Sequence, residues 1–369
     1  MALSVVHVAQ PVVGGVPRYL GPLLRDQRER GLDVVVCCSP SGDVALEAST
    51  AGVPVIPWPA TRNPGPRIVG ETARLARIIA KAQPDVVHLH SSKAGLAGRL
   101  AVRGRRPTVF QPHGWSFEAV EGPLRRVVVA WERAAARWAD ALICVSEAER
   151  ERGVAAGIEA PWAVIPTGID LRAFPAASDD DRAAARTALG VAGDRLVVCI
   201  GRLSRAKGQD VLLDAWPRVS AAVPGAELVL VGDGPERPAL ERLAGNGARL
   251  IGERDDIQTW LAAADVVAVP SRWEAMSLVM LEAMSTARSV VATDVAGVRE
   301  ALGDGSSAVV PVEDRRALAE ALVQRLLDPQ LAAAEGAASR RKAEQAYDAP
   351  RATEAIAGVY ERVWRERGR

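Results

Sequence analysis

Short apolar runs alternate with amphipathic stretches along most of this chain, and this alternation limits the possible folds more than any other feature. The first apolar runs are residues 5–8, 34–38, 53–56, 86–89, 108–110 and 141–145. Helical patterns lie between them at residues 18–31, 70–82 and 123–139. Apolar runs without polar alternation are typical of parallel strands that are buried on both faces. The pattern therefore predicts βαβ units and a doubly wound parallel sheet.

A second series of the same kind begins near residue 196. Its apolar runs are residues 196–200, 227–231, 249–251, 266–269 and 290–292. A polar stretch at residues 176–182 separates the two series, and 369 residues exceed one ordinary domain. We expect an N-terminal domain of residues 1–172 and a C-terminal domain of residues 173–345. We expect a last helix, residues 346–369, to pack back on the N-terminal domain.

Composition excludes several classes of protein. Hydrophobic residues make up 49% and charged residues 25%, which indicates a globular chain rather than a disordered one. The formal charge of +1 argues against a dedicated nucleic-acid binder. The four cysteines lack the CxxC spacing of a zinc site, and neither a secretory signal nor an apolar run of ~20 residues is present. These features predict a cytoplasmic protein.

Glycines and cations after the predicted strands suggest anion binding. Gly14-Gly15 follows the first strand, where a helix N-terminus offers unpaired N–H groups, although a tight turn explains the pair as well. Arg202 and Lys207 lie five residues apart after the strand at 196–200, and two such cations can hold a diphosphate. Gly232 begins half a dinucleotide fingerprint, but the third glycine would fall at Arg237, which argues against a nicotinamide enzyme.

Two glutamates stand at either side of a predicted helix start. Ser277 is a plausible N-cap, with Glu274 in the loop before it and Glu282 about one turn into the helix. Eight residues along a helix span ~12 Å, too far for two carboxylates to act on one bond. Glu282 lies within an apolar run, where burial without a partner is costly. We interpret the pair as holding two ends of an extended ligand.

All four histidines lie in the first third of the chain: His7, His88, His90 and His113. Their irregular spacing matches no HxxEH-type motif, so no metal site is predicted. His7 and His88 fall inside strands and are expected to be core residues. His113-Gly114-Trp115 follows a strand and offers a flat indole face to a ligand. Residues 90–95, which include His90 and Lys93, are predicted to form a strand-to-helix loop rich in hydrogen-bond donors.

Taken in order, these segments resemble the GT-B glycosyltransferases of family 4. The resemblance spans nearly the whole chain, and its landmarks are Gly14-Gly15, residues 88–95, His113-Gly114, residues 145–147, residues 165–170, Gly201-Arg202, Lys207-Gly208, residues 232–234 and the EX7E pair Glu274 and Glu282. It implies two Rossmann-like domains that face each other across a cleft. It also implies a hexosyltransferase that moves a sugar from a nucleotide-diphosphate sugar, with a UDP-sugar favoured, with retention at the anomeric carbon.

The resemblance also implies roles for individual residues. The catalytic residues are His113, Arg202, Lys207 and Glu274. The donor-binding residues are Gly14, Gly15, Arg202, Lys207, Gly232, Arg254, Glu274, Ser277, Leu278, Val279 and Glu282. The acceptor-binding residues are His90, Lys93 and Trp115. Arg202 and Lys207 would hold the diphosphate, and Glu282 the ribose. Such enzymes need no protein nucleophile, no cofactor and in general no metal, and this chain has no donor-site DxD.

Two positions depart from the family pattern. Ala275 and Ala287 stand where the family often has glycine, and we expect an added methyl group to narrow the pocket beside the donor sugar. Among the rest of the segments, 90–95 and 113–115 resemble members that extend lipid-linked glycans. A lipid-linked glycan is therefore one expected acceptor, and a soluble natural product stays open as another.

The charge distribution bears on a membrane partner. Up to residue 165 the chain has 20 basic and 15 acidic side chains, and beyond it 26 and 30. In residues 123–139 the apolar side chains share one helical face, with four arginines mainly off it. We favour packing of this helix into the core, with peripheral contact to anionic lipid as the alternative. The oligomeric state is not predicted.

Two other functions stay open at this point. One is a GT-B-type sugar-nucleotide epimerase, which would release a free altered sugar from the donor alone. The other is a non-catalytic subunit that binds the donor. Retention of Arg202, Lys207 and Glu282 speaks against the latter.

Overall fold

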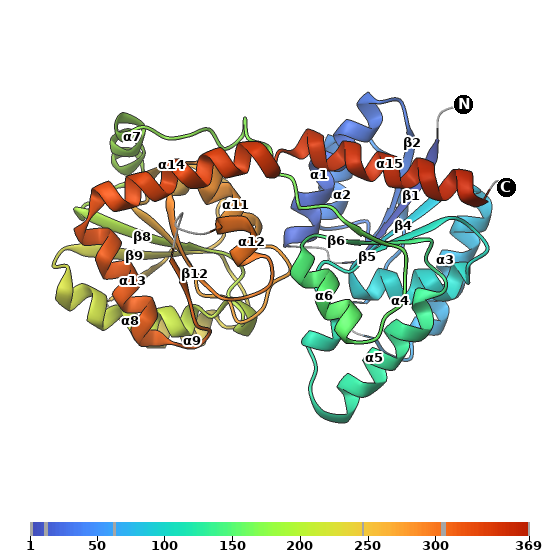
Figure 1. Ribbon diagram of the computed structural model, residues 1–369, viewed down its shortest axis with the longest axis horizontal. Helices are drawn as coiled ribbons and strands as arrows, with labels where there is room; N and C mark the ends of the chain where they lie inside the picture. Colours follow the sequence, from blue (N-terminus) through green and yellow to red (C-terminus); the bar gives the residue numbers. More distant parts are fainter. Residues whose placement is uncertain (1–2, 11–13, 62–63, 246, 304–307, 368–369) are drawn as a thin grey trace. The chain divides into compact units, whose positions relative to one another are not determined.

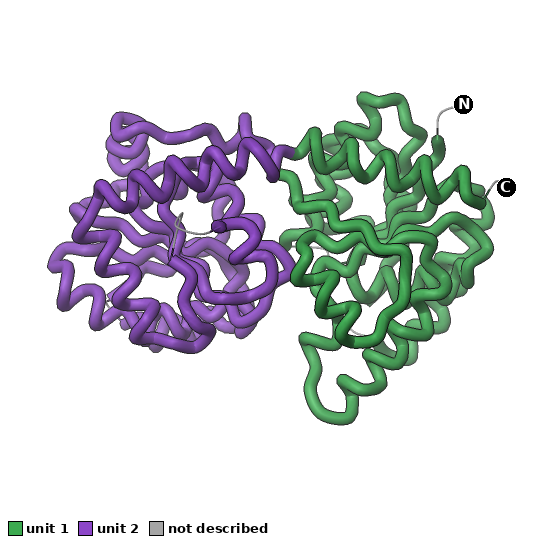
Figure 2. Tube along the Cα trace, viewed as in Figure 1, with its two compact units in different colours: residues 1–168, 349–369 green, residues 169–348 purple. Residues whose placement is uncertain are grey.

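The computed structural model describes residues 3–10, 14–61, 64–245, 247–303 and 308–367 (Figure 1). The chain divides into two compact α/β units, which Figure 2 distinguishes by colour. Unit 1 consists of residues 1–168 and 349–369, and unit 2 of residues 169–348. The changes from one unit to the other thus fall at 168/169 and 348/349, a few residues from the expected 172/173 and 345/346.

Unit 1 is built on a seven-stranded parallel sheet in the order β3-β2-β1-β4-β5-β6-β7. Its strands are β1 (Ser4–Ala9), β2 (Asp33–Cys38), β3 (Val55–Pro57), β4 (Val86–His90), β5 (Thr108–Gln111), β6 (Ala141–Cys144) and β7 (Trp162–Val164). Its helices are α1 (Gly15–Glu29), α2 (Asp43–Thr50), α3 (Ile68–Ala82), α4 (Ser91–Val102), α5 (Gly122–Ala136), α6 (Glu147–Ala155) and α15 (Ala349–Arg367), with a short 3₁₀ helix η1 (Ser116–Glu118). The predicted doubly wound fold is confirmed.

The two faces of the unit 1 sheet pack against different helices. Val5 and Ala9 of β1 lie on the face covered by α1, α2 and α15. Val6 and Val8 lie on the opposite face, covered by α3 and α4. Because side chains alternate along a strand, both faces must be apolar when both are covered, which explains the uninterrupted apolar runs. The last helix, α15, is part of the unit 1 core through Ile356 and neighbouring side chains.

Unit 2 repeats the plan with a six-stranded parallel sheet in the order β10-β9-β8-β11-β12-β13. Its strands are β8 (Arg195–Ile200), β9 (Ala226–Val231), β10 (Arg249–Leu250), β11 (Val266–Val269), β12 (Ser289–Thr293) and β13 (Ala308–Val310). Its helices are α7 (Asp179–Leu189), α8 (Gln209–Ala222), α9 (Arg237–Ala244), α10 (Ile257–Ala263), α11 (Leu278–Ser285), α12 (Val298–Leu302), α13 (Arg315–Leu327) and α14 (Pro329–Ala346), with a 3₁₀ helix η2 (Arg205–Lys207).

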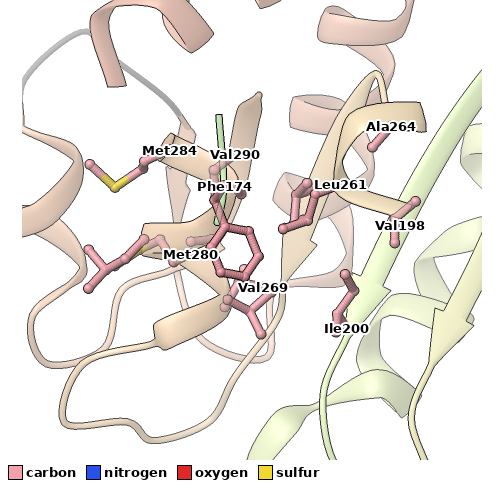
Figure 3. Packing of buried hydrophobic residues seen from close by; sticks show 14 of the residues in the cluster. Phe174, Val198, Ile200, Leu261, Ala264, Val269, Met280, Met284 and Val290 are labelled. Atoms are coloured by element: carbon pink, nitrogen blue, oxygen red, sulfur yellow. The ribbon is translucent and has the colours of Figure 1, made fainter. Parts of the chain in front are cut away.

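One face of the unit 2 sheet packs around Phe174 (Figure 3). The Phe174 ring lies among side chains from β11 and α11, including Val269 and Met280, while Val198 and Ile200 of β8 belong to the same cluster. This cluster buries α11 on the sheet. The helix that carries Glu282 is too short to be stable by itself, so its apolar contact with the sheet holds it in place.

The polar stretch at residues 176–182 is mostly helix rather than extended linker. Ser178 caps the N-terminus of α7, and Asp181 completes a capping box by accepting a hydrogen bond from the Ser178 backbone N–H at 2.9 Å. Asp179 and Asp180 lie in the same first turn, where negative charge is favourable. The aspartate run thus stabilises a helix start.

In both sheets the strand order reverses beside the first strand of the unit. β1 has β2 on one side and β4 on the other, and β8 has β9 and β11. Such a switch point opens a crevice at the carboxyl ends of the two strands, because their following loops diverge to opposite sides. Ligand-binding residues are expected in the loops after β1 and β4 in unit 1, and after β8 and β11 in unit 2.

The close packing of α4 on the sheet gives a first prediction. A Cβ atom at Gly95 would lie 2.3 Å from Cε2 of the buried Phe110 ring. Gly95→Ala is expected to lower the free energy of unfolding by about 1–3 kcal/mol, because the ring cannot move aside in a filled core. Chemical denaturation measures the change.

Gly358, in the exposed middle of α15, is the matched control. A Cβ there meets nothing within 4 Å. Gly358→Ala should raise stability by about 0.5–1 kcal/mol through helix propensity. Equal effects at the two positions would contradict the packing argument.

Candidate active site

The loop after β8 is shaped by close backbone contact with the loop after β9. A Cβ atom at Gly232 would lie 2.1 Å from the carbonyl oxygen of Gly201, so only glycine fits there. Gly232 also has a positive φ of 137° and donates its N–H to the Gly252 carbonyl oxygen at 2.7 Å. The glycines predicted from a phosphate-binding pattern thus join two loops at the carboxyl edge of the sheet. Because glycine has no side chain, these positions leave space around the cations Arg202 and Lys207 in the loop after β8.

Lys207 and Glu274 form an ion pair at the unit 2 switch point. The Lys207 Nζ contacts Glu274 Oε1, and the Ser271 hydroxyl donates to the same oxygen at 2.9 Å. Lys207 follows β8 and Glu274 follows β11, the two strands where the order reverses. Both residues belong to the predicted donor site, but the sequence pattern does not predict that they contact each other.

Arg272 fixes the same two loops together and was missed from the sequence. Its guanidinium donates to both carboxylate oxygens of Asp210, at 2.8 and 2.7 Å, and to the Arg205 carbonyl oxygen at 2.9 Å. It also pairs with Glu313. These hydrogen bonds lower the pKa of Asp210 below its ordinary value. A bidentate pair of this kind limits how far the loop after β11 can move from η2.

The N-terminus of α11 lies directly after Glu274. Ser277 is the N-cap, as predicted, and its hydroxyl accepts from the Met280 N–H at 3.4 Å. The first N–H groups of a helix have no partner within the helix, so those of Leu278 and Val279 are suited to an anion. Glu282 is buried on the second turn of the same helix. The loop before α11 therefore carries a carboxylate that contacts the Lys207 ammonium, and the N–H groups of the helix start follow it directly in sequence.

The other predicted donor-binding residues take varied positions. Arg202 is exposed; its carbonyl oxygen accepts from the buried Gln209 side chain at 3.0 Å. Arg254 pairs with Asp256 through two hydrogen bonds of 3.0 and 3.1 Å. In unit 1, Gly14 precedes α1 with φ 107°, and a Cβ there would meet nothing within 4 Å. Gly14 thus meets the backbone requirement of a helix-start anion site, with Gly15 as the first helical residue.

Ala287, expected from the sequence to narrow the pocket beside the donor sugar, lies just beyond the C-terminus of α11. It follows Ser285, the last residue of that helix, and so lies at the opposite end from Ser277. Its φ is 58°, in the left-handed region that glycine adopts without strain. The family glycine at this position therefore serves the backbone turn into β12. An alanine here costs about 1 kcal/mol of strain.

Unit 1 gathers all four histidines into one buried polar cluster. His7 pairs in register with His88 across β1 and β4, and His90 pairs with Gln111 across β4 and β5. Register partners point to the same face of a sheet, here the face covered by α1 and α15. His7, His88 and His90 are fully buried, and His113 is partly exposed at the edge of the cluster. The prediction that His7 and His88 are core residues is confirmed.

The loop that carries His113 is held by a buried carboxylate. Glu149 accepts hydrogen bonds from the Gly114 N–H at 2.6 Å and the Val145 N–H at 2.8 Å. Burial raises the pKa of Glu149 to about 7. His113 has a positive φ of 52°, unusual for a residue with a side chain. Such a conformation persists only where neighbouring contacts hold it, and it is common at functional sites.

The three residues predicted to bind an acceptor are buried within unit 1. Lys93 forms an ion pair of 2.6 Å with Glu71, and Trp115 stacks on Phe117 and donates its indole N–H to the Glu149 carbonyl oxygen at 2.7 Å. His90 lies in the histidine cluster. The predictions of an exposed indole face at Trp115 and of a donor-rich loop at residues 90–95 are therefore wrong. Residues 91–95 already belong to α4 rather than to a loop.

The ring nitrogens of His7, His88 and His90 lie close enough to raise the question of a metal. One nitrogen from each lies within 4.8 Å of the others. Burial lowers the pKa of His7 to about 4 and those of His88 and His90 well below the ordinary value, so all three are neutral. However, His7 Nδ1 and His90 Nε2 are 2.9 Å apart, a hydrogen-bond distance. Two nitrogens on a tetrahedral zinc stand about 3.3 Å apart, so the observed geometry is that of a hydrogen bond.

Helix α5 is less buried than expected. Leu124 and Val127, on its predicted core face, are 55% and 64% exposed, beside the exposed Arg125 and Arg126. Val128 and Val129 are partly buried against the core, and full burial begins only at Glu132, Ala135 and the residue after it. Within the described residues, none of the helices is both long and apolar enough to cross a membrane.

Together, the two doubly wound units and the cationic switch point of unit 2 define a two-domain enzyme of the nucleotide-binding α/β class. Residues 13–173 match the family described as Glycosyltransferase Family 4, and residues 194–328 match Glycosyl transferases group 1. The chain belongs to glycosyltransferase family 4, with the GT-B fold, and is a glycosyltransferase.

Named relatives and a solved structure agree with this assignment. A GDP-mannose-dependent monoacylated alpha-(1-6)-phosphatidylinositol monomannoside mannosyltransferase of Corynebacterium glutamicum is 30% identical over 364 residues, 93% of each chain. A UDP-Gal:alpha-D-GlcNAc-diphosphoundecaprenol alpha-1,3-galactosyltransferase of Escherichia coli is 32% identical over 238 residues, 60% of this chain and 61% of that one. The crystal structure of Anabaena HepE with UDP and glucose is similar with a TM-score of 0.85 and 25% identity, covering 97% and 99% of the two chains.

The histidine cluster predicts that unit 1 is the acid-sensitive unit. A histidine with a lowered folded pKa is neutral in both states above pH 6.5, whereas below it the unfolded state gains the proton first. Stability is therefore lost as the pH falls from about 6.5 toward 4. His7 alone accounts for about 2 kcal/mol at pH 5. Glu149, with its raised pKa, opposes this, but it is one group against four histidines.

Hydrogen exchange at pH 7.5 and pH 5, corrected for intrinsic rates, measures this effect. Protection of β1, β4 and β5 should fall much more than that of β8, β9 and β11. Unit 2 is the internal control, because the four histidines of the chain all lie in unit 1. An equal loss in both units would count against the histidine cluster as its source.

Proposed function

We propose that this enzyme is a retaining, metal-independent glycosyltransferase that uses a nucleotide-diphosphate sugar, with a UDP-sugar as the favoured donor. The observation that carries the proposal is the position of Lys207 and Glu274 at the unit 2 switch point, directly before the N-terminus of α11. A diphosphate between Lys207 and the first N–H groups of α11 would meet a point charge and a helix start at once.

Each donor group has a matching side chain in this proposal. Lys207 and the exposed Arg202 hold the diphosphate, and Glu282 accepts hydrogen bonds from the ribose hydroxyls. Glu274 and His113 contact the transferred sugar, and Arg254 lies in the turn assigned to the base. The Lys207 ammonium contacts the Glu274 carboxylate, so its positive charge offsets the repulsion between this carboxylate and an anionic ligand.

The chemistry needs orientation and charge stabilisation rather than a protein nucleophile. As the bond between sugar and diphosphate breaks, negative charge grows on the leaving phosphate. Lys207, Arg202 and the N–H groups of α11 stabilise that charge, and the phosphate oxygen accepts the proton of the attacking hydroxyl on the same face of the sugar. These cations take the part that a divalent ion plays in other sugar transferases, which supports the metal-independent proposal.

The base of the donor has two candidates. A bound UDP in the similar HepE structure supports uridine. GDP-mannose is the second candidate, because the Corynebacterium relative that matches 93% of each chain is named as GDP-mannose-dependent. Both relatives named above act on lipid-linked acceptors by name, which supports a lipid-linked glycan as acceptor here.

Calorimetric titration of UDP and GDP tests the donor site. Lys207→Ala and Glu282→Ala are each expected to weaken nucleotide binding by about ten- to a hundredfold, since a charged hydrogen bond contributes roughly 1.5–3 kcal/mol. Arg205→Ala is the matched control, because it removes a cation from the exposed part of the same loop.

Arg205→Ala should change the affinity by less than about threefold, through the general field alone. Unchanged affinity in both Lys207→Ala and Glu282→Ala would refute the site assignment. Tighter binding of GDP than of UDP would retain the site and replace uridine by guanosine.

The exposed part of α5 supports peripheral contact with a membrane that contains anionic lipid. Leu124→Ser combined with Val127→Ser should lower binding to anionic vesicles by at least about tenfold, because two exposed apolar side chains lose their insertion energy. Sedimentation with anionic and neutral vesicles measures the binding. Val69→Ser on α3 removes another exposed apolar side chain of unit 1 and should have no effect. Binding without dependence on anionic lipid would remove this part of the proposal.

A further inference from the structure

A chain of hydrogen bonds runs from His113 into the interior of unit 1. His113 Nε2 lies 3.1 Å from His90 Nδ1, and His90 Nε2 lies 2.9 Å from His7 Nδ1. His7 Nε2 in turn lies 2.8 Å from Oε1 of Gln27 on α1. Three imidazoles are thus connected nitrogen to nitrogen, with a carboxamide at the inner end and the partly exposed His113 at the outer end.

The carboxamide gives the chain its direction. The Gln27 amide nitrogen donates to the hydroxyl of Tyr360 on α15 at 3.2 Å, which leaves the carboxamide oxygen facing His7. The Tyr360 hydroxyl lies 2.6 Å from His88 Nδ1 and has its own proton for that contact. Because a carboxamide oxygen only accepts, the proton between Gln27 and His7 must belong to His7 Nε2.

Neutral imidazoles pass this constraint outward one ring at a time. A neutral ring has one N–H, so His7, with its proton on Nε2, accepts at Nδ1. The proton between His7 and His90 is therefore on His90 Nε2, and His90 accepts at Nδ1. The same step places the proton of His113 on Nε2. Burial lowers the pKa of His113 to about 3, which is consistent with a neutral ring.

We infer that Gln27, acting through His7 and His90, holds His113 in the Nε2–H tautomer and leaves Nδ1 as a hydrogen-bond acceptor. Among the described residues, Nδ1 of His113 has no recorded polar partner, and the ring is packed edge-on against Tyr19 at 4.8 Å between centroids. His90 and Gln27 are positioning residues in this scheme, because they act through His113.

The fixed tautomer selects the chemistry that His113 recognises. An acceptor nitrogen binds a donor such as a hydroxyl group and does not bind a carbonyl or phosphate oxygen. If the proposed function is correct, His113 contacts a sugar or acceptor hydroxyl and not the diphosphate. This consequence rests on the proposed function, whereas the tautomer itself is a property of the protein without substrate.

Nuclear magnetic resonance of the ligand-free protein, labelled at the histidine ring nitrogens, tests the inference. Long-range proton–nitrogen correlations distinguish a protonated from an unprotonated ring nitrogen, and His113→Gln assigns the relevant signals. At neutral pH, Nε2 of His113 should carry the proton. A proton on Nδ1, an averaged pair of tautomers, or signals of a metal-bound ring at His7 and His90 would overturn the inference.

Three variants separate the relay from general core damage. His90→Phe interrupts the chain and should produce a mixture of His113 tautomers. His90→Gln retains one donor and one acceptor and should restore the single tautomer. Val8→Ala removes fully buried core volume on the opposite face of the same sheet, away from the His7 to His113 path, and should leave the tautomer unchanged. A single Nε2–H tautomer in His90→Phe would also overturn the assignment.

The tautomer of His113 can be tested independently of the proposed function. Loss of UDP binding in the Lys207 variant concerns unit 2 alone, whereas the tautomer is observed without a nucleotide. A protein with the predicted tautomer but no donor affinity would retain the relay and reject the proposed function.

Discussion

The parallel register of the two sheets is the constraint on which the rest of the structure depends. Because all strands of a sheet run the same way, the loops after β8 and β11 leave from one edge, and Lys207 meets Glu274 across 67 residues of chain. In unit 1 the same rule aligns His7 with His88 and His90 with Gln111. An antiparallel pairing of β8 with β11 would place the loops that follow these strands at opposite edges of the sheet and separate Lys207 from Glu274. The candidate site is thus a product of topology first and of residue type second.

Much of the fold was predictable, because its signals are local. Uninterrupted apolar runs indicate strands buried on both faces, and the cap at Ser277 is visible as a serine before an apolar helical run. The partners of charged side chains were not predictable. Arg272 binds Asp210 across 62 residues, and Lys93 finds Glu71 on a neighbouring helix. No local sequence signal distinguishes a buried, paired lysine from an exposed one, so Lys93 was wrongly predicted to lie at the surface. The prediction of an exposed indole at Trp115 was wrong for the same reason, because its burial depends on its contacts with Phe117 and Glu149.

The departures from the family pattern show how backbone geometry alters an inference from sequence. At Ala287 the missing glycine suggested an altered sugar pocket, but the structure gives a left-handed residue at the far end of α11. The structure therefore gives this alanine a backbone consequence, strain at a turn. Ala275 differs, because it lies in the loop next to Glu274, and a Cβ added at Gly297 would stand 2.7 Å from its carbonyl oxygen. The backbone at Ala275 is thus closely packed against Gly297, directly beside Glu274.

The Lys207–Glu274 pair of unit 2 and the histidine cluster of unit 1 meet the cost of burying polar groups in different ways. Unit 2 places ionised pairs at its switch point, where partial exposure lessens desolvation and the charges suit an anionic ligand. Unit 1 buries imidazoles that stay neutral. In a chain of neutral rings, all hydrogen bonds form only if each ring N–H faces an acceptor nitrogen or oxygen. The irregular spacing of the histidines argued against a metal motif. It also gave no sign of the hydrogen-bonded chain, because the strand register brings together histidines that are far apart in sequence. A neutral relay orients the His113 ring without placing a formal charge on it, so the order of the protons alone decides which ring nitrogen can accept a hydrogen bond.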